Sequence, residues 1–183
     1  VPFKVVEHIH EGILTASKTI SEHAAGIGST VHDWISQGIK YKMGNAELPV
    51  MPVDDEAINC VEAFKDWAKG KNINWTSTEQ KIYHHSDTVI ERFAGTVDAV
   101  AKINGKEYVI DFKTSKKIYK PYHLQVAAYA KAIDKMYDTK PWGLILRLDK
   151  ETGKFQEKVF DPEPHYKIFN LCLQLKEWNS VRI

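Results

Sequence analysis

The sequence predicts an α/β fold in which a mixed central β-sheet is flanked by helices. Helix-type apolar spacing fills about the first 70 residues, and strand-type patterns follow over residues 73–113. A helical segment then leads into another apolar strand, so hairpin and crossover connections mix antiparallel and parallel pairs. We expect one domain over residues 1–183, with a helical part at about 1–70, a sheet core at about 73–160 and a last helix at about 163–180.

The helical part divides at its breaker residues. Residues 1–25 alternate weakly between apolar and polar and are compatible with a short amphipathic helix. The glycine, serine and threonine cluster at residues 26–30 is expected to break the chain and to cap a new helix from Val31. Residues 41–53 predict a loop, and Asp54 then begins a second helix that Gly70 ends.

The sheet part reads as strands separated by turns and one helix. Residues 73–83 predict one long or two short strands, with a polar turn over 84–88. Strands at 89–103 and 106–113 are joined by Asn104-Gly105, the strongest short hairpin signal. The remaining expected elements are a helix from Pro121 to about Tyr137, a buried strand over 142–148, an edge strand ending near Phe160, and the last helix.

Composition excludes several classes of protein. The net charge is +1, so only a local cluster could argue for nucleic acid. Cys60 and Cys172 form no CxxC pair and cannot alone build a zinc ribbon or an iron–sulfur cluster; both are expected to be buried free thiols. No membrane span or signal peptide is visible, although the chain begins at Val1 and can be a trimmed fragment. We expect an intracellular, reducing compartment: bacterial or phage-infected cytoplasm, or an organelle matrix.

The Asn-Gly hairpin carries the main functional signal. A two-residue type I′ loop pairs Ile103 with Lys106 and sets Asp98 opposite Asp111, with Lys113 on the same face. Like charges directly opposite destabilise a sheet, so a divalent cation between the carboxylates is indicated. A solvated acidic face is the alternative, but the apolar neighbours of both acids favour a buried site.

Other polar residues are weaker candidates for the same site. Even-length loops centred on Ser86-Asp87 would place Glu79 opposite Ala94, on the face of Asp98, although a surface glutamate fits equally well. His32 lies one turn into the helix after the glycine cluster, and nothing local selects it among eight histidines. Gln125 and Tyr129 are four residues apart on one helix face that would pack near Lys113.

The loop after Lys113 is basic and holds no acid. Lysines contact phosphates and tyrosines stack on unpaired bases, so a nucleic-acid strand over the site is favoured against a plain solvated loop. The expected nucleic-acid contacts in the loop and the next helix are Thr114, Ser115, Lys116, Lys117, Tyr119, Lys120, Tyr122 and Tyr129.

Together these motifs resemble the PD-(D/E)XK nuclease superfamily, whose core is restriction-endonuclease-like. The resemblance covers about residues 28–129 and rests on Gly95-Thr96-Val97-Asp98, Val109-Ile110-Asp111-Phe112-Lys113-Thr114-Ser115, and Gln125 with Ala128-Tyr129-Ala130. The order is similar to the RecB-type exonuclease branch, which includes nuclease domains of bacterial recombination helicases, CRISPR-associated exonucleases and the mitochondrial genome maintenance exonuclease.

The resemblance implies roles for single residues. His32, in Gly28-Ser29-Thr30-Val31-His32, would bind a metal with Asp98, Asp111 and the backbone carbonyl of Phe112. Lys113 would be the catalytic lysine, Gln125 and Tyr129 the supporting motif, and Glu79 the acid of the first strand. Several relatives hold an iron–sulfur cluster with a cysteine before the histidine; none precedes His32, so we expect no such cluster.

These features predict a Mg²⁺- or Mn²⁺-dependent deoxyribonuclease, expected to be an exonuclease acting at DNA ends or in single strands. The chain has no helicase part, so a helicase or another replication, repair or recombination protein would be a separate chain. No membrane partner is expected. The alternatives are a structure- or sequence-specific endonuclease and a module on the same fold that binds DNA or a partner without cleavage.

Overall fold

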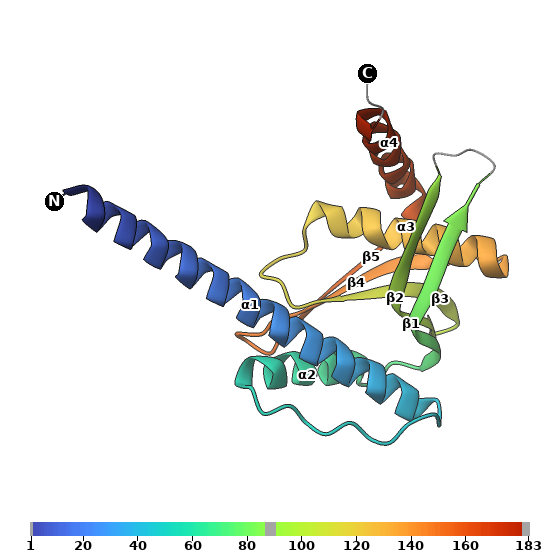
Figure 1. Cartoon of the computed structure of the whole chain (residues 1–183). Helices are drawn as coiled ribbons and strands as arrows, with labels where there is room; N and C mark the ends of the chain where they lie inside the picture. The colour runs from blue at the N-terminus through green and yellow to red at the C-terminus, as the bar shows by residue number, and fades with distance from the viewer. Residues whose placement is uncertain (1, 87–90, 181–183) are drawn as a thin grey trace.

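A computed structural model of the chain describes the backbone of residues 2–86 and 91–180, and the side chains of residues 22–86 and 91–179. Four helices and five strands make up this part of the chain (Figure 1). In order they are α1 (Pro2–Lys42), α2 (Asp55–Ala68), β1 (Ile73–His85), β2 (Arg92–Ile103), β3 (Lys106–Lys113), α3 (Lys120–Tyr137), β4 (Trp142–Leu148), β5 (Phe155–Phe160) and α4 (Pro162–Ser180).

The strands form one mixed sheet in the order β1-β2-β3-β4-β5. The pair β3–β4 is parallel because α3 connects its strands, and the other neighbouring pairs are antiparallel. This arrangement confirms the predicted α/β class with a mixed central sheet. The β1 and β5 strands lie at its edges.

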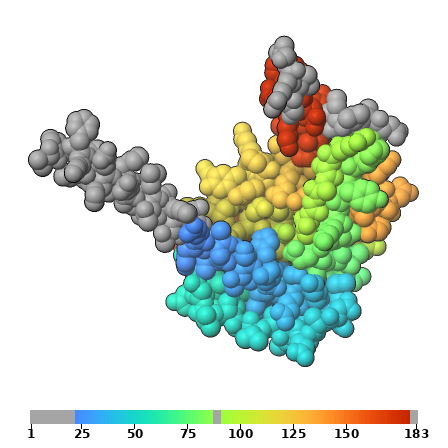
Figure 2. All heavy atoms as spheres, in the orientation of Figure 1, coloured from blue at the N-terminus to red at the C-terminus, as the bar shows by residue number. Residues whose placement is uncertain are grey.

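Helices cover both faces of the sheet. The first apolar core joins α1 and α2 to one face and includes Val31, Trp67 and Phe112. The second joins α3 to the other face through residues such as Val126 and Ile145. In the space-filling view, α1 and α2 lie on the opposite side of the molecule from α4 (Figure 2). Alternate residues of β3 point into these two different cores. Each polar residue of β3 therefore lies on the same face as the residue two positions away.

The Asn-Gly hairpin has the predicted register. Asn104 and Gly105 both adopt positive φ, at 51° and 83°, as a type I′ loop requires. Ile103 pairs with Lys106, and the ladder continues in step to Ala99 and Ile110. The turn chemistry thus sets which residues of β2 and β3 meet at the far end of the hairpin.

The predicted break at residues 26–30 is wrong, because α1 continues through this cluster to Lys42. Glycine lowers helix stability by about 1 kcal/mol relative to alanine, which does not end a helix whose neighbouring turns are well packed. Ile27 and Val31 are both buried in the first core and hold the helix on either side of Gly28. The helix that carries His32 is therefore an internal part of α1 and has no cap at this point.

Two further boundaries differ from prediction. The turn expected over 84–88 begins later, because His84 and His85 still pair with Phe93 and Arg92. The strand expected from residue 89 is described from Arg92, and residues 87–90 lie outside the described residues. Burial of His84 against the ring of Phe93 accounts for the longer β1.

The two cysteines are free thiols, and only one has the predicted burial. Cys60 is buried in α2 and lies 3.5 Å from the carbonyl of Leu148. Cys172 is exposed on α4, so its predicted burial is wrong: most of its neighbours on this part of the helix are exposed as well. None of the described helices combines the length and the apolar character that a membrane span needs.

Candidate active site

The ladder between β2 and β3 ends where the two acidic residues lie. Ala99 and Ile110 are the last described pair, and one step further Asp98 uses its side chain: its Oδ2 accepts the backbone N–H of Phe112 at 2.8 Å. The backbone carbonyl of Asp98 accepts the hydroxyl of Thr78 from β1 at 2.8 Å. Asp98 therefore holds the end of β3 next to β2.

Asp111 is the buried acid of the pair. Its side chain is 1% exposed, and Lys113 Nζ lies 3.0 Å from its Oδ1. Its second oxygen, Oδ2, is buried and has no hydrogen-bond partner among the described residues. A buried, unpartnered carboxylate oxygen is costly, and a bound cation is one of the few groups that can compensate it.

A hydrogen-bonded chain runs from Asp111 into α3. Lys113 Nζ donates to Gln125 Oε1 at 3.2 Å, and Gln125 Nε2 donates to the hydroxyl of Tyr129 at 3.0 Å. The Lys113 ammonium also lies 4.8 Å from the centre of the Tyr122 ring. The structure thus brings Gln125 and Tyr129 to the lysine, as their shared helix face predicted.

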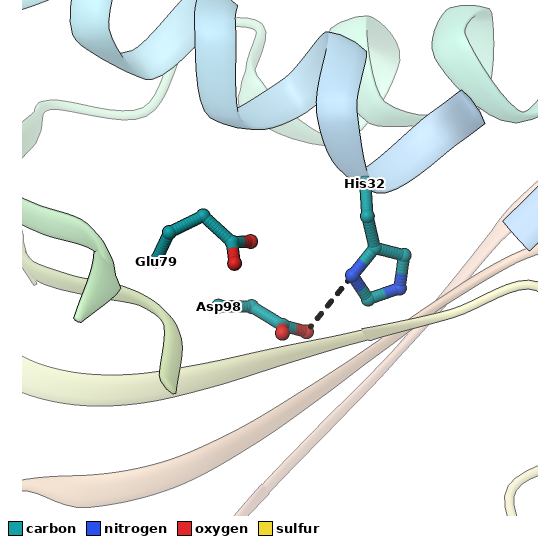
Figure 3. Close-up of side chains that lie close together, drawn as sticks. All are labelled: His32, Glu79 and Asp98. Carbon is teal, nitrogen blue, oxygen red and sulfur yellow. Dashed lines mark ion pairs between the residues drawn. The ribbon is translucent and has the colours of Figure 1, made fainter. Parts of the chain in front are cut away.

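His32, Glu79 and Asp98 converge between α1 and the strands of the sheet (Figure 3). One ligand atom of each lies within 4.8 Å of those of the others, and His32 Nδ1 is 3.5 Å from Asp98 Oδ2. The His32 ring also packs edge-on against Phe112, with centroids 6.2 Å apart. One nitrogen and several carboxylate oxygens are suitable donors for a divalent cation.

The predicted register of Glu79 is wrong, although it lies next to Asp98. Ala94 pairs with Tyr83, and the pairs Thr78–Ala99 and Gln80–Val97 leave Glu79 at the level of Asp98. The ladder shifts between Trp75 and Ser77, and Glu79 itself has a positive φ of 49°. This local irregularity brings the Glu79 carboxylate toward His32 and Asp98.

The charges of the site shift the pKa values of its members. Burial raises the pKa of Asp111 to about 7, against the opposing effect of Lys113. Burial lowers the pKa of His32, but the hydrogen bond to Asp98 and the charges of Asp98 and Asp111 outweigh it and raise that pKa. Desolvation and the Asp98 charge raise the pKa of Glu79. Excess negative charge thus favours bound protons or a bound cation here.

The basic loop follows Lys113 directly, between the end of β3 and the start of α3. Lys116, Lys117, Tyr119 and Lys120 are exposed, and the rings of Tyr119 and Tyr122 meet edge-on with centroids 5.6 Å apart. The hydroxyl of Ser115 donates to the carbonyl of Lys117 at 2.9 Å. Exposed lysines and tyrosine rings thus follow Lys113 along the chain, and one of these rings, that of Tyr122, lies against its ammonium.

Arg147 holds the loop after Lys113 and was not predicted from the sequence. It pairs in parallel register with Lys113, and its Nε donates to the carbonyl of Ser115 at 2.7 Å. Its Nη2 donates to Asp149 Oδ2 at 2.6 Å. The parallel pairing of β3 with β4 was the signal that could have found it, because both strands end at the same edge.

Comparison with known proteins identifies the superfamily of the chain. The family model described as the PD-(D/E)XK nuclease superfamily matches residues 6–180, which is nearly the whole chain and includes all the site residues above. No curated protein matches the sequence. The family-model match reaches well beyond half of the sequence, and the chain belongs to the PD-(D/E)XK nuclease superfamily.

Proposed function

We propose that this protein is a Mg²⁺- or Mn²⁺-dependent deoxyribonuclease of the RecB-type branch, in which residues 1–183 form one nuclease domain. It hydrolyses phosphodiester bonds as an exonuclease, at DNA ends or in single strands. Family membership supports a hydrolase that acts on nucleic acid and uses a divalent metal.

One observation carries the proposal most directly. The buried Asp111 carboxylate accepts a hydrogen bond from Lys113 at one oxygen, and its other oxygen has no partner among the described residues. The charges of Asp98 and His32, which form a cluster with Glu79, act on this carboxylate. A structural ion pair would normally satisfy both oxygens, whereas a metal ligand needs a free one. The donors therefore fit a hard divalent cation.

Each of these residues has a proposed role in binding. His32, Asp98, Asp111 and the backbone carbonyl of Phe112 would hold the cation, with Glu79 as a further acid of the site. Asp98 also accepts the N–H of Phe112, which fixes the peptide between Asp111 and Phe112. When bound, the cation would supply Lewis-acid polarisation of a phosphoryl oxygen and lower the pKa of a nearby water.

Lys113 is the proposed catalytic cation of the chain itself. Its side chain is 18% exposed, so it can reach a substrate phosphate while Asp111 and Gln125 hold its ammonium in position. A positive charge fixed there stabilises the negative charge that develops on the phosphate during in-line attack by water. Gln125 orients Lys113, and Tyr129 in turn orients Gln125.

The substrate strand is proposed to cross the basic loop. The phosphate contacts would come from Thr114, Ser115 and the exposed lysines 116, 117 and 120, and the base contacts from Tyr119, Tyr122 and Tyr129. A separate helicase or other repair or recombination protein would supply unwound DNA. The free, buried thiol of Cys60 suits a reducing compartment of the cell.

End-labelled single- and double-stranded DNA, incubated with Mg²⁺, Mn²⁺ or a chelator, tests this function. We expect mononucleotides or short products from one end with either metal and intact DNA with the chelator. Circular single-stranded DNA should stay intact, because only an endonuclease can open a circle. Metal-dependent opening of the circle would show that the protein is an endonuclease instead. Retention of uncut DNA in a gel would overturn the catalytic proposal.

A further inference from the structure

A separate cavity lies between the end of α1, residues 43–54, α2 and the beginning of β1. It has a volume of about 880 Å³. It is separate from the proposed nuclease site, because its lining includes none of His32, Glu79, Asp98, Asp111 and Lys113. Its size is typical of pockets that bind a small molecule or part of a larger ligand. The connection from α1 back to the start of α2 passes alongside α2 and closes one side (Figure 1).

Aromatic side chains form the floor of this cavity. The Phe64 ring stacks on the Trp75 ring with centroids 6.3 Å apart, and it meets Trp34 edge-on at 6.5 Å. Phe64 is buried, while Trp34 and Trp75 are partly exposed to the cavity that they line. Flat aromatic surfaces of this kind accept a nucleobase by stacking, whatever the base.

The rim of the cavity is positively charged. Lys42, Lys65, Lys69 and Lys71 line it, against one acid, Asp66. Lys65 and Lys71 are paired with glutamates, but among the described residues the side chains of Lys42 and Lys69 make no ion pair or hydrogen bond. Two free ammonium groups on the rim of a cavity that aromatic rings also line complement a planar ligand that carries negative charge.

Trp34 also carries a hydrogen-bond donor that is not used. Its indole Nε1 is buried and has no hydrogen-bond acceptor among the described residues. A buried N–H without an acceptor is costly, and the Trp34 Nε1 would reach a ligand oxygen only if the cavity wall moved. The cavity as it stands combines a stacking surface with free cations, which are features that a nucleotide uses.

Two of the elements that line the cavity also carry residues of the cluster formed by His32, Glu79 and Asp98. The α1 helix carries both Trp34 and His32, and β1 carries both Trp75 and Glu79. Trp75 and Glu79 are four residues apart, which corresponds to about 13 Å along a strand. We propose that this cavity binds an unpaired nucleotide of single-stranded DNA whose neighbouring nucleotides lie in the nuclease site; the inference rests on the proposed function.

Binding to a single-stranded decathymidylate in chelator tests the cavity without cleavage. The readout is quenching of intrinsic tryptophan fluorescence, and the variant is Lys42→Glu/Lys69→Glu, at two exposed positions. Lys158→Glu/Lys167→Glu makes the same charge change at exposed positions of β5 and α4. We expect binding at least tenfold weaker in the cavity variant and a small change in the control. Equal weakening in both variants, or none in either, would overturn the proposal.

Cleavage kinetics separate this inference from the proposed function. With the decanucleotide, the cavity variant should show a KM raised at least fivefold and a kcat close to that of the parent. If the parent cleaves and the cavity variant has an unchanged KM, the cavity proposal fails while the nuclease stands. If the parent binds through the cavity but cleaves nothing, the proposed function fails and the cavity stands.

Discussion

Lys113 holds one oxygen of the Asp111 carboxylate at 3.0 Å, while the other oxygen is buried and has no partner among the described residues. The two residues lie two apart on β3 and share a face of the strand. Asp98 completes the arrangement by accepting the N–H of Phe112. Incomplete pairing of a buried acid is the feature from which the chemistry of the site follows.

The first prediction concerns the pH dependence of stability without metal. Burial raises the pKa of Asp111 from its ordinary 3.8 to about 7, so the folded state binds this proton more tightly than the unfolded chain. The resulting stabilisation is complete below about pH 3.8 and is lost as pH rises through about 7. Urea unfolding of the parent and of Asp111→Asn should show that the free energy difference between them changes over this window.

The comparison is cleanest between about pH 4 and 6. The raised pKa of His32 also contributes stability that is lost with rising pH, but only above its ordinary value of 6.5. Asp66→Asn, at an exposed position of α2, controls for removal of a carboxylate. A difference between the parent and Asp111→Asn that stays constant with pH would mean that folding does not raise the pKa of Asp111.

The second prediction concerns metal binding in the absence of DNA. A cation that binds only the folded state stabilises it by about 2.7 kcal/mol at one hundred times its Kd. Mn²⁺ should therefore raise the Tm of the parent by several degrees, and His32→Ala should lose most of this rise. His85→Ala, an exposed histidine of β1, should keep it. An equal rise in both variants would exclude His32 as a ligand.

The third prediction concerns the close approach of Gly95 to Tyr129. A Cβ added at Gly95 would lie 2.7 Å from Cε1 of Tyr129, so Gly95→Ala must displace a partly buried ring. We expect a loss of about 1–3 kcal/mol of stability from overpacking. Displacement of the ring would also weaken the 3.0 Å bond from Gln125 to Tyr129 and lower cleavage activity.

A matched glycine serves as its control. Gly26 lies in α1, and a Cβ added there meets nothing within 4 Å. Gly26→Ala should therefore leave stability unchanged or raise it by about 0.5–1 kcal/mol. If chemical denaturation shows that Gly95→Ala is as stable as the parent, Tyr129 is free to move and does not hold Gln125 in place.

The fourth prediction concerns Arg147, which fixes the loop after Lys113. Its side chain bonds the carbonyl of Ser115 and the carboxylate of Asp149. Arg147→Ala should cost about 1.5–3 kcal/mol, the usual range for a hydrogen bond to a charged group. Because the loop is the proposed DNA contact, KM for DNA should rise more than kcat falls. A fall in kcat alone would place Arg147 in the chemical step instead.

The hairpin was predictable because its turn chemistry is local. Asn104 and Gly105 tolerate positive φ, so the two-residue loop and the register of the following pairs could be derived from the sequence. That register correctly brought Asp98 and Asp111 to the same end of the hairpin. The hydrogen bond from Phe112 to the Asp98 side chain was not predictable, because the ladder is interrupted there by a side chain.

The position of Glu79 could not be derived from the sequence. Its register was predicted from an assumed loop around residues 86–87, and Glu79 instead lies four residues away from that pairing, near Asp98. A shift at Trp75 and Ser77 and a positive φ at Glu79 itself have no signature in the sequence. The choice of His32 among eight histidines likewise came from family resemblance, because a long-range contact leaves no local pattern.

The helix boundary at residues 26–30 failed for a different reason. Local propensity disfavours a helix through Gly26 and Gly28, but burial of Ile27 and Val31 decides the outcome. The strands and the last helix carried strong periodic patterns and were predicted more closely. Tertiary packing thus determined the structure at the positions where the local signals were weakest.

Cleavage of end-labelled single-stranded DNA by Asp111→Ala and Lys113→Ala, with Mn²⁺ present, tests the central claim most directly. Both variants should keep a folded circular dichroism spectrum and lose cleavage by about a hundredfold or more, because each removes a charge from the reacting centre. Lys158→Glu/Lys167→Glu should cleave at close to the parent rate. Cleavage at the parent rate by both Asp111→Ala and Lys113→Ala would contradict the assignment of this site as the nuclease centre.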